Sequence, residues 1–118
     1  MEKVLYHYKA KIIEVYDGDT CTLDIDLGLN IWNKEEKIRL NRINAPELRG
    51  DEKAKGLESR DYLGSLILDK EIFTESLKDR REKYGRYLAE IWLADENGKF
   101  NNINDEMVKN GFAKYQQY

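Results

Sequence analysis

The chain has 118 residues, of which 41% are hydrophobic and 36% are charged, and its formal net charge is −3 at pH 7. These values indicate one globular domain over residues 1–118 and give no sign of a strongly basic nucleic-acid binder, although a local basic cleft can lie on an acidic protein. No apolar run approaches the ~18 residues of a membrane-spanning helix, and the N-terminus lacks the apolar stretch of a signal peptide. We therefore expect a monomer without membrane association, cytoplasmic as the sequence stands, or secreted if a leader has been removed.

The first third of the chain predicts three consecutive strands. Residues 6–15 are rich in β-branched and aromatic side chains, and their alternation slips at Ile12–Ile13, as a β-bulge would cause. The Asp-Gly-Asp sequence at 17–19 predicts a turn. Apolar and polar residues then alternate strictly over 20–27, which is typical of a half-buried strand, and a third strand is predicted over 38–43.

The single cysteine, Cys21, lies on the apolar face of the second predicted strand. A lone cysteine excludes an internal disulfide and a multi-cysteine metal cage, so we expect a small buried hydrophobic side chain. The sole histidine, His7, has no second histidine or cysteine with which to share a transition metal, and we interpret it as a surface residue.

The remainder of the chain predicts a helix, two strands and a second helix. A helical stripe of apolar residues covers 51–68, and two strand patterns follow at 70–76 and 85–94, separated by a charged loop. We expect Asn104 to cap a short helix over 105–110. This order predicts a five-stranded OB-fold barrel, mainly β within the α+β class, with two or three flanking helices. An SH3-like barrel or an α+β sandwich would give a similar pattern.

Polar residues gather in four clusters at predicted strand ends or in loops, where functional sites are usually built. The clusters are Asp17–Thr20, Arg39 with Asn44–Glu47, Lys83–Arg86, and the terminal tyrosines Tyr115 and Tyr118. Taken singly, each has an ordinary explanation: a hairpin turn, a solvated arginine, a turn before a strand, and tyrosines packed against a helix.

Together the clusters supply the groups that phosphodiester cleavage requires. Acidic turns offer hard oxygen ligands, which suit Ca²⁺ or Mg²⁺ better than zinc. Two arginines on separate segments can hold one phosphate from two sides, because the guanidinium group matches phosphate oxygens. A free carboxylate beside them can take a proton from water. We predict that Arg39, Glu47 and Arg86 converge on one pocket at the edge of the barrel.

Four segments, in order along the chain, resemble the thermonuclease family, which consists of staphylococcal-nuclease-like domains. The segments are VYDGDTCTLDI, IRLNRINAPELRG, KYGRYLAEIWL and NDEMVKNGFAKY, and the resemblance spans about residues 10–115. It implies an OB-fold barrel with flanking helices. It also implies a calcium-dependent nuclease that hydrolyses DNA and RNA with little sequence specificity and leaves 3′-phosphate ends.

The resemblance also implies roles for individual residues. Asp19 is similar to a calcium-binding carboxylate, Arg39 and Arg86 to two phosphate-binding arginines, and Glu47 to the glutamate that serves as general base. Four further residues match substrate-binding positions. Lys83 and Tyr84 would contact phosphate, and Tyr115 and Tyr118 are candidates for base stacking.

One position departs from the family pattern. Asn44 stands where an aspartate usually helps to bind calcium. Its amide oxygen and the backbone carbonyl of Ala45 can still act as ligands, but the site carries less negative charge, so we expect weaker calcium binding. Asn44 also favours an alternative, in which the barrel binds nucleic acid without cleaving it. In a third interpretation, a purely structural barrel, all four clusters would be coincidental.

Overall fold

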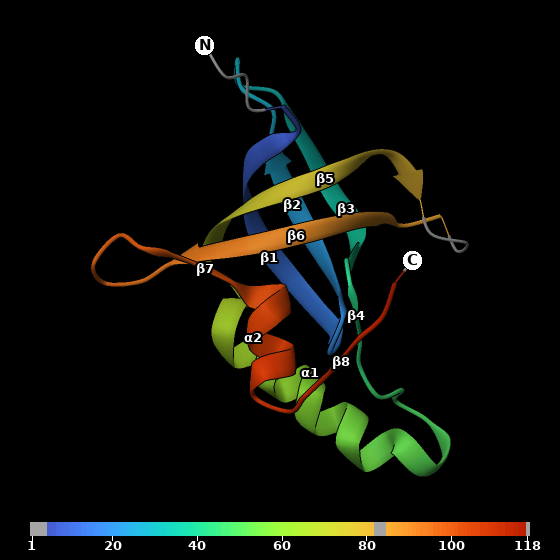
Figure 1. Cartoon of the computed structure of the whole chain (residues 1–118). Coiled ribbons are helices and arrows are strands. Elements are labelled where there is room, and N and C mark those ends of the chain that lie inside the picture. Colours follow the sequence, from blue (N-terminus) through green and yellow to red (C-terminus); the bar gives the residue numbers. More distant parts are fainter. Residues whose placement is uncertain (1–4, 82–84, 118) are drawn as a thin grey trace.

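A computed structural model of the chain describes residues 5–81 and 85–117, with the side chains of 78–81 left out (Figure 1). In chain order the elements are β1 (His7–Asp17), β2 (Thr20–Asp26), β3 (Trp32–Leu40), β4 (Ile43–Asn44), a 3-10 turn (Gly50–Glu52), α1 (Lys53–Ile67), β5 (Glu71–Arg81), β6 (Tyr87–Ala94), β7 (Phe100–Asn102), α2 (Ile103–Lys109) and β8 (Lys114–Tyr115). The predicted order of three strands, a helix, two strands and a helix is confirmed for the longer elements, whereas the short strands β4, β7 and β8 were not predicted.

Within the described residues, strands β1, β2, β3, β5 and β6 close into a five-stranded barrel, as in an OB-fold. Neighbouring strands pair antiparallel in the order β3-β2-β1-β5-β6. Closure comes from a short parallel pairing of β3 with β6, in which Ile38 to Leu40 lie opposite Tyr87 to Ala89. Both helices lie at one end of the barrel, and the β2–β3 hairpin lies at the other (Figure 1). The predicted fold is therefore confirmed.

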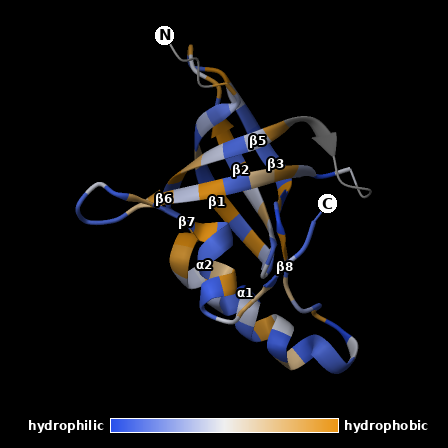
Figure 2. Ribbon diagram, in the orientation of Figure 1, coloured by the Kyte–Doolittle hydropathy of each residue, from blue (hydrophilic) through white to orange (hydrophobic). Residues whose placement is uncertain are grey.

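The hydrophobic core fills the barrel and the space under α1. Hydrophobic and hydrophilic residues alternate along the strands, which directs one set of side chains inward (Figure 2). Cys21 is fully buried, as predicted, and Leu63 and Ile67 of α1 are fully buried in the same cluster. The predicted bulge in the first strand is confirmed by a register shift between Ile12 and Glu14. Neither helix within the described ranges is long and apolar enough to cross a membrane.

The predicted bounds of two strands are wrong. Strand β3 begins at Trp32 rather than at residue 38 and ends at Leu40, because its first half is held by pairing to β2 while its charged side chains remain largely exposed. This part of β3 therefore lacks the alternation of apolar and polar residues from which a strand is predicted. Ile43 and Asn44 form β4, which pairs with β8. Strand β5 extends to Arg81, into the predicted charged loop.

The predicted helix cap is also wrong. Asn102 caps α2, since its Oδ1 accepts a hydrogen bond from the backbone N–H of Asp105 at 2.9 Å. Asn104 is instead fully buried in the first turn of the helix. Its side-chain amide accepts from the N–H of Ile91 and donates to the carbonyls of Asn41 and Ala89. Asn104 therefore fastens the helix to the barrel.

Candidate functional site

Two glycines allow three segments to approach closely at one end of the barrel. A Cβ atom at Gly18, in the turn between β1 and β2, would lie 2.7 Å from the Cβ atoms of both Ala45 and Ser59. A Cβ at Gly56, in α1, would lie 2.7 Å from the carbonyl carbon of Glu47. The turn, the helix and the segment after β3 (residues 41–49, called the corner below) therefore meet where side chains larger than hydrogen do not fit.

A buried ion pair lies where the turn meets the corner. Nη1 of Arg39 lies 3.1 Å from Oδ2 of Asp19, and the two residues are only 8% and 5% exposed. Thr20 and Arg39 are opposite each other in the β2–β3 register, which brings the preceding Asp19 within reach. Oδ2 of Asp19 also accepts from the backbone N–H of Ala45 at 2.8 Å, and Oδ1 accepts from the Thr20 hydroxyl at 3.1 Å. Buried charges require such partners.

Arg39 also binds the corner itself. Its Nη1 donates to the carbonyl of Ile43 at 3.3 Å, and its Nη2 donates to Oδ1 of Asn44 at 3.0 Å. The amide oxygen of Asn44, predicted from the sequence as a calcium ligand, therefore accepts a hydrogen bond from an arginine. Ala45 contributes its N–H to Asp19. The metal-ligand roles of Asn44 and of the Ala45 carbonyl remain predictions.

A surface cleft with a volume of about 860 Å³ lies beside this pair. It is lined by Glu14, Tyr16, Asp17, Thr20, Thr22, Lys37, Glu47, Leu48, Arg49 and Arg86. Two of the predicted catalytic residues, Glu47 and Arg86, thus line the same cleft. Nη1 of Arg86 donates to Oγ1 of Thr20 at 3.1 Å. Because Thr20 in turn donates to Asp19, it links Arg86 to the buried Asp19–Arg39 pair.

Glu47 is exposed at the edge of this cleft, and its Oε2 accepts from Nε of Arg49 at 3.0 Å. Both side chains are largely in solvent, at 61% and 84% exposure, so water can reach the carboxylate. An exposed carboxylate in contact with solvent can accept a proton from water.

Burial and neighbouring charges set the electrostatics of the acidic turn. The pKa of Asp19 is raised to about 6, chiefly by burial and also by the neighbouring Asp17 carboxylate, while Arg39 and the N–H of Ala45 oppose the change. Carboxylate, amide and carbonyl oxygens are hard donors of the kind that Ca²⁺ takes. Among the described residues there is no group of three or more Asp, Glu, His or Cys side chains arranged to hold a metal. A calcium ion would therefore need neutral oxygens and water as well.

The remaining predicted substrate-binding residues lie away from the cleft or outside the described structure. Tyr115 is 59% exposed, and its hydroxyl donates to Oδ1 of Asp105 at 3.0 Å. The guanidinium of Arg42 lies 6.0 Å from the centre of the same ring. Tyr115 thus contacts α2 and the corner. Lys83, Tyr84 and Tyr118 lie outside the described residues.

Thr20 and Lys37 are among the polar residues of the cleft that were not predicted from the sequence as site residues. Thr20 was noted only as part of the acidic turn, whereas its hydroxyl joins two predicted site residues. Lys37 lines the cleft and lies opposite Thr22 in the β2–β3 register. A signal existed for it, because Lys37 is two residues before Arg39, and residues i and i+2 of a strand share a face.

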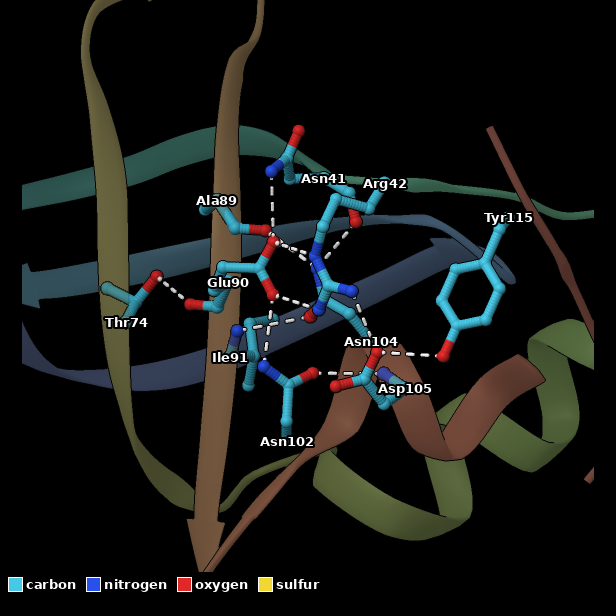
Figure 3. A network of polar contacts seen from close by, with 10 residues as sticks. All are labelled: Asn41, Arg42, Thr74, Ala89, Glu90, Ile91, Asn102, Asn104, Asp105 and Tyr115. Atoms are coloured by element: carbon cyan, nitrogen blue, oxygen red, sulfur yellow. Dashed lines mark hydrogen bonds and ion pairs between the residues drawn. The ribbon is translucent and has the colours of Figure 1, made fainter. Parts of the chain in front are cut away.

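A second polar network holds the corner in place (Figure 3). The buried carboxylate of Glu90, on β6, accepts two hydrogen bonds from Arg42, at 3.0 and 2.7 Å, and one each from Asn41 and Asn102. Arg42 also donates to Asp105 of α2 at 2.8 Å, which holds the pKa of that carboxyl below its ordinary value. The network therefore ties the corner to β6 and to α2.

Comparisons with known proteins identify a family and several similar sequences. The profile of a family described as "Staphylococcal nuclease homologue" matches residues 37–118. The chain is 28% identical to a thermonuclease of Staphylococcus hyicus over 111 residues, which cover 92% of this chain and 59% of that protein. It is 27% identical to a thermonuclease of Staphylococcus intermedius over 107 residues, covering 88% and 57%.

An archaeal protein is similar to the same degree. An uncharacterised protein of Methanocaldococcus jannaschii is 28% identical over 129 residues, covering 92% of this chain and 59% of that protein. The chain thus spans less than two thirds of the length of these curated relatives.

Proposed function

Because this chain belongs to the family of staphylococcal nuclease homologues, we propose that it is a calcium-dependent nuclease. Its substrates are DNA and RNA, which it cleaves with little sequence specificity to leave 3′-phosphate ends. Three observations support the proposal: the matching family, the thermonucleases among its relatives, and the cleft beside the acidic turn.

The observation that carries the proposal is the shared position of Glu47 and Arg86 in one cleft, directly beside the buried Asp19–Arg39 pair. In the proposed reaction Glu47 takes a proton from the attacking water. Arg86 neutralises the charge that develops on the phosphoryl oxygens. Arg39 adds positive charge from beneath the wall of the cleft, and it also fixes the positions of Asp19 and Asn44.

The proposed calcium ligands are the carboxylates of Asp17 and Asp19, the amide oxygen of Asn44 and the carbonyl of Ala45. When bound, calcium supplies Lewis-acid polarisation of a phosphate oxygen. In the described structure, Thr20 and Ala45 hold Asp19 by hydrogen bonds, so this carboxylate is oriented by the chain itself.

The second candidate function is a barrel that binds nucleic acid without cleaving it. One observation favours it: the Asn44 oxygen is engaged by Arg39, and Arg39 is 8% exposed, so both are occupied within the chain. Against it stands Glu47, whose exposed carboxylate in the cleft has no evident role in a module that binds phosphate only.

A cleavage assay tests the proposal. End-labelled single-stranded DNA and RNA are incubated with the purified protein in Ca²⁺ and, separately, in excess chelator. The Glu47→Gln variant, purified in parallel, serves as the control for a contaminating nuclease. Calcium-dependent cleavage by the wild type that is strongly reduced in the variant supports the nuclease. Binding of both substrates without cleavage in calcium would instead support the binding module.

A further inference from the structure

Tyr16 is the one aromatic side chain among the described residues that line the cleft. It is the extra residue of a β-bulge, because Val15 and Asp17 of β1 lie opposite the consecutive residues Cys21 and Thr20 of β2. Bulges redirect a side chain, and they are common next to active sites. Tyr16 is 59% exposed, and no hydrogen bond or ring contact within the described part of the chain accounts for its position. Its ring is therefore accessible to a ligand in the cleft.

Lys37 supplies a positive charge to the same cleft. It is exposed, and among the described residues it forms no ion pair. Lys37 is two residues before Arg39, so the two side chains share one face of β3 and their Cα atoms lie about 7 Å apart. Thr20, which lies opposite Arg39, accepts a hydrogen bond from Arg86. Lys37 is therefore one step along the sheet from the arginines that act on the scissile phosphate in the proposed reaction.

Tyr16 and Lys37 lie on either side of β2. Thr22 of β2 is opposite Glu14 of β1 and opposite Lys37 of β3. Neighbouring strands lie roughly 4.8 Å apart, so β1 and β3 are roughly 10 Å apart across β2. This span is comparable with the extent of one nucleotide, with its phosphate over β3 and its base over β1. The exposed Glu14 carboxylate repels a phosphate from β1, so it favours the same orientation.

A nucleotide of a single strand carries the two groups that this pair can bind. Stacking on an aromatic ring is favourable for every base, because each base has a π-face. The phosphate is an anion, which an ammonium group binds as a point charge. Within a duplex the bases are already stacked on one another, so a tyrosine reaches a base only where the strands are open. The pair therefore suits single-stranded nucleic acid and does not select a sequence.

We propose that Tyr16 and Lys37 form a subsite for the nucleotide next to the scissile phosphate. The base of this nucleotide stacks on Tyr16, and its phosphate binds Lys37. The subsite rests on the proposed nuclease function, because the scissile phosphate defines its place in the cleft. It gives the cleft a preference for single strands with at least two phosphates.

Strand binding tests the stacking contact without cleavage. The full chain is titrated into fluorescein-labelled oligothymidylate in excess chelator, and binding is followed by fluorescence anisotropy. Tyr16→Leu should weaken binding about tenfold, which corresponds to ~1.4 kcal/mol and lies in the range for one base on an aromatic ring. Tyr16→Phe should bind as tightly as the wild type, because stacking does not need the hydroxyl. Trp32→Leu is the matched control, since Trp32 is 45% exposed and does not line the cleft, and its affinity should equal that of the wild type.

The salt dependence of binding tests the phosphate contact. Each phosphate bound by a cation contributes about 0.7 to the slope of log affinity against log salt concentration for a single strand, so Lys37→Gln should lower the slope by about that amount. Lys34→Gln is the matched control, because Lys34 is exposed on the same strand and does not line the cleft, and its slope should equal that of the wild type. Tyr16→Leu should also keep the slope of the wild type, since stacking neutralises no phosphate.

Photocrosslinking of the wild type gives a measurement that needs no variant. A strand in which 5-iodouracil replaces thymine crosslinks on irradiation to an aromatic ring stacked on it, so the crosslinked peptide should contain Tyr16. The proposal would be overturned by wild-type affinity in Tyr16→Leu, by an unchanged slope in Lys37→Gln, by a crosslink only at other residues, or by no strand binding.

Cleavage of the same strand in calcium separates the subsite from the proposed function. Calcium-dependent cleavage by the wild type, together with unchanged binding by Tyr16→Leu and Lys37→Gln, would exclude the subsite and leave the nuclease. The expected binding losses without any cleavage in calcium would instead support the strand-binding pair and exclude the nuclease.

Discussion

Replacing Arg42 with alanine should destabilise the protein substantially without touching the candidate cleft. Arg42 donates two hydrogen bonds to Glu90, whose side chain is 9% exposed, and one to Asp105. Among the described residues, its removal leaves the buried Glu90 carboxylate with only the amides of Asn41 and Asn102 as donors. An unpaired buried carboxylate is unfavourable because it has lost water without gaining an opposite charge.

The magnitude follows from the exposure of the two partners. Breaking a fully buried ion pair costs about 3–5 kcal/mol. The Arg42 side chain is 41% exposed, so solvent screens part of the interaction, and we expect a loss of about 2–3 kcal/mol in the free energy of unfolding.

The backbone at this position adds a second expectation. Arg42 has φ +68°, in the left-handed region, where a side chain costs roughly 1–2 kcal/mol relative to glycine. Relative to alanine, glycine lowers the free energy of unfolding by about 0.4–1 kcal/mol, because it raises the conformational entropy of the unfolded chain. Arg42→Gly should therefore be more stable than Arg42→Ala, by roughly 0.5–1 kcal/mol.

Urea denaturation of the wild type, both variants and Arg60→Ala provides the measurement. Arg60 forms an exposed ion pair with Asp61, at 39% and 71% side-chain exposure, so its removal should change stability by no more than about 0.5 kcal/mol. If Arg42→Ala lost no more stability than Arg60→Ala, the network would not hold the corner. If the glycine variant were no more stable than the alanine variant, the backbone argument would be wrong.

Glu47→Gln should lower the cleavage rate by about 10² or more while calorimetry shows unchanged calcium binding; an unchanged rate would exclude Glu47 as the base. Asn44→Asp should tighten calcium binding several-fold, because affinity rises with ligand charge, and equal affinities in both proteins would show that residue 44 is not a ligand. Gly56→Ala should lower the melting temperature, because a Cβ there clashes with the backbone of Glu47 and the clash outweighs the ~1 kcal/mol by which alanine favours a helix. Gly64→Ala should instead raise the melting temperature, because there is open space around Gly64. The hydrogen bond from Arg42 lowers the pKa of Asp105 from 3.8. The ionised Asp105 carboxylate should therefore stabilise the fold fully at neutral pH, and this stabilisation should be lost as the pH falls below 3.8. Measurements of the free energy of unfolding against pH should lack this decline in the Arg42→Ala variant.

The sequence predicted those strands whose two faces differ in polarity. Strand β2 alternates from Thr20 to Asp26, and its boundary was confirmed to within one residue. The first half of β3 could not be predicted, because Lys34 and Glu35 are exposed and an exposed strand has no apolar face. The N-cap residue of α2 could not be predicted for another reason. Asn102 and Asn104 are both good caps in isolation, and only the packed barrel determines which amide is buried.

The candidate site was predictable as a set of segments but not as a set of contacts. Motif residues indicated that the acidic turn and the corner belong together. The bond between Arg39 and Asn44 depends on strand register and on the path of the corner, neither of which appears in local sequence. The orientation of Tyr115 toward Asp105 was likewise unpredictable, because an exposed tyrosine near a chain end has many possible partners.

The pairing of β4 with β8 has a consequence for the order in which the protein acquires its structure. Ile43 and Asn44 lie opposite Tyr115 and Lys114, and the N–H of Gln116 donates to the carbonyl of Arg42 at 2.8 Å. Contacts between residues so far apart in sequence form late, since a long loop must close first. On the ribosome, the barrel strands emerge before the segment that fastens the corner. The corner that carries Glu47 therefore reaches its final geometry only after residue 116 has been synthesised and has left the exit tunnel.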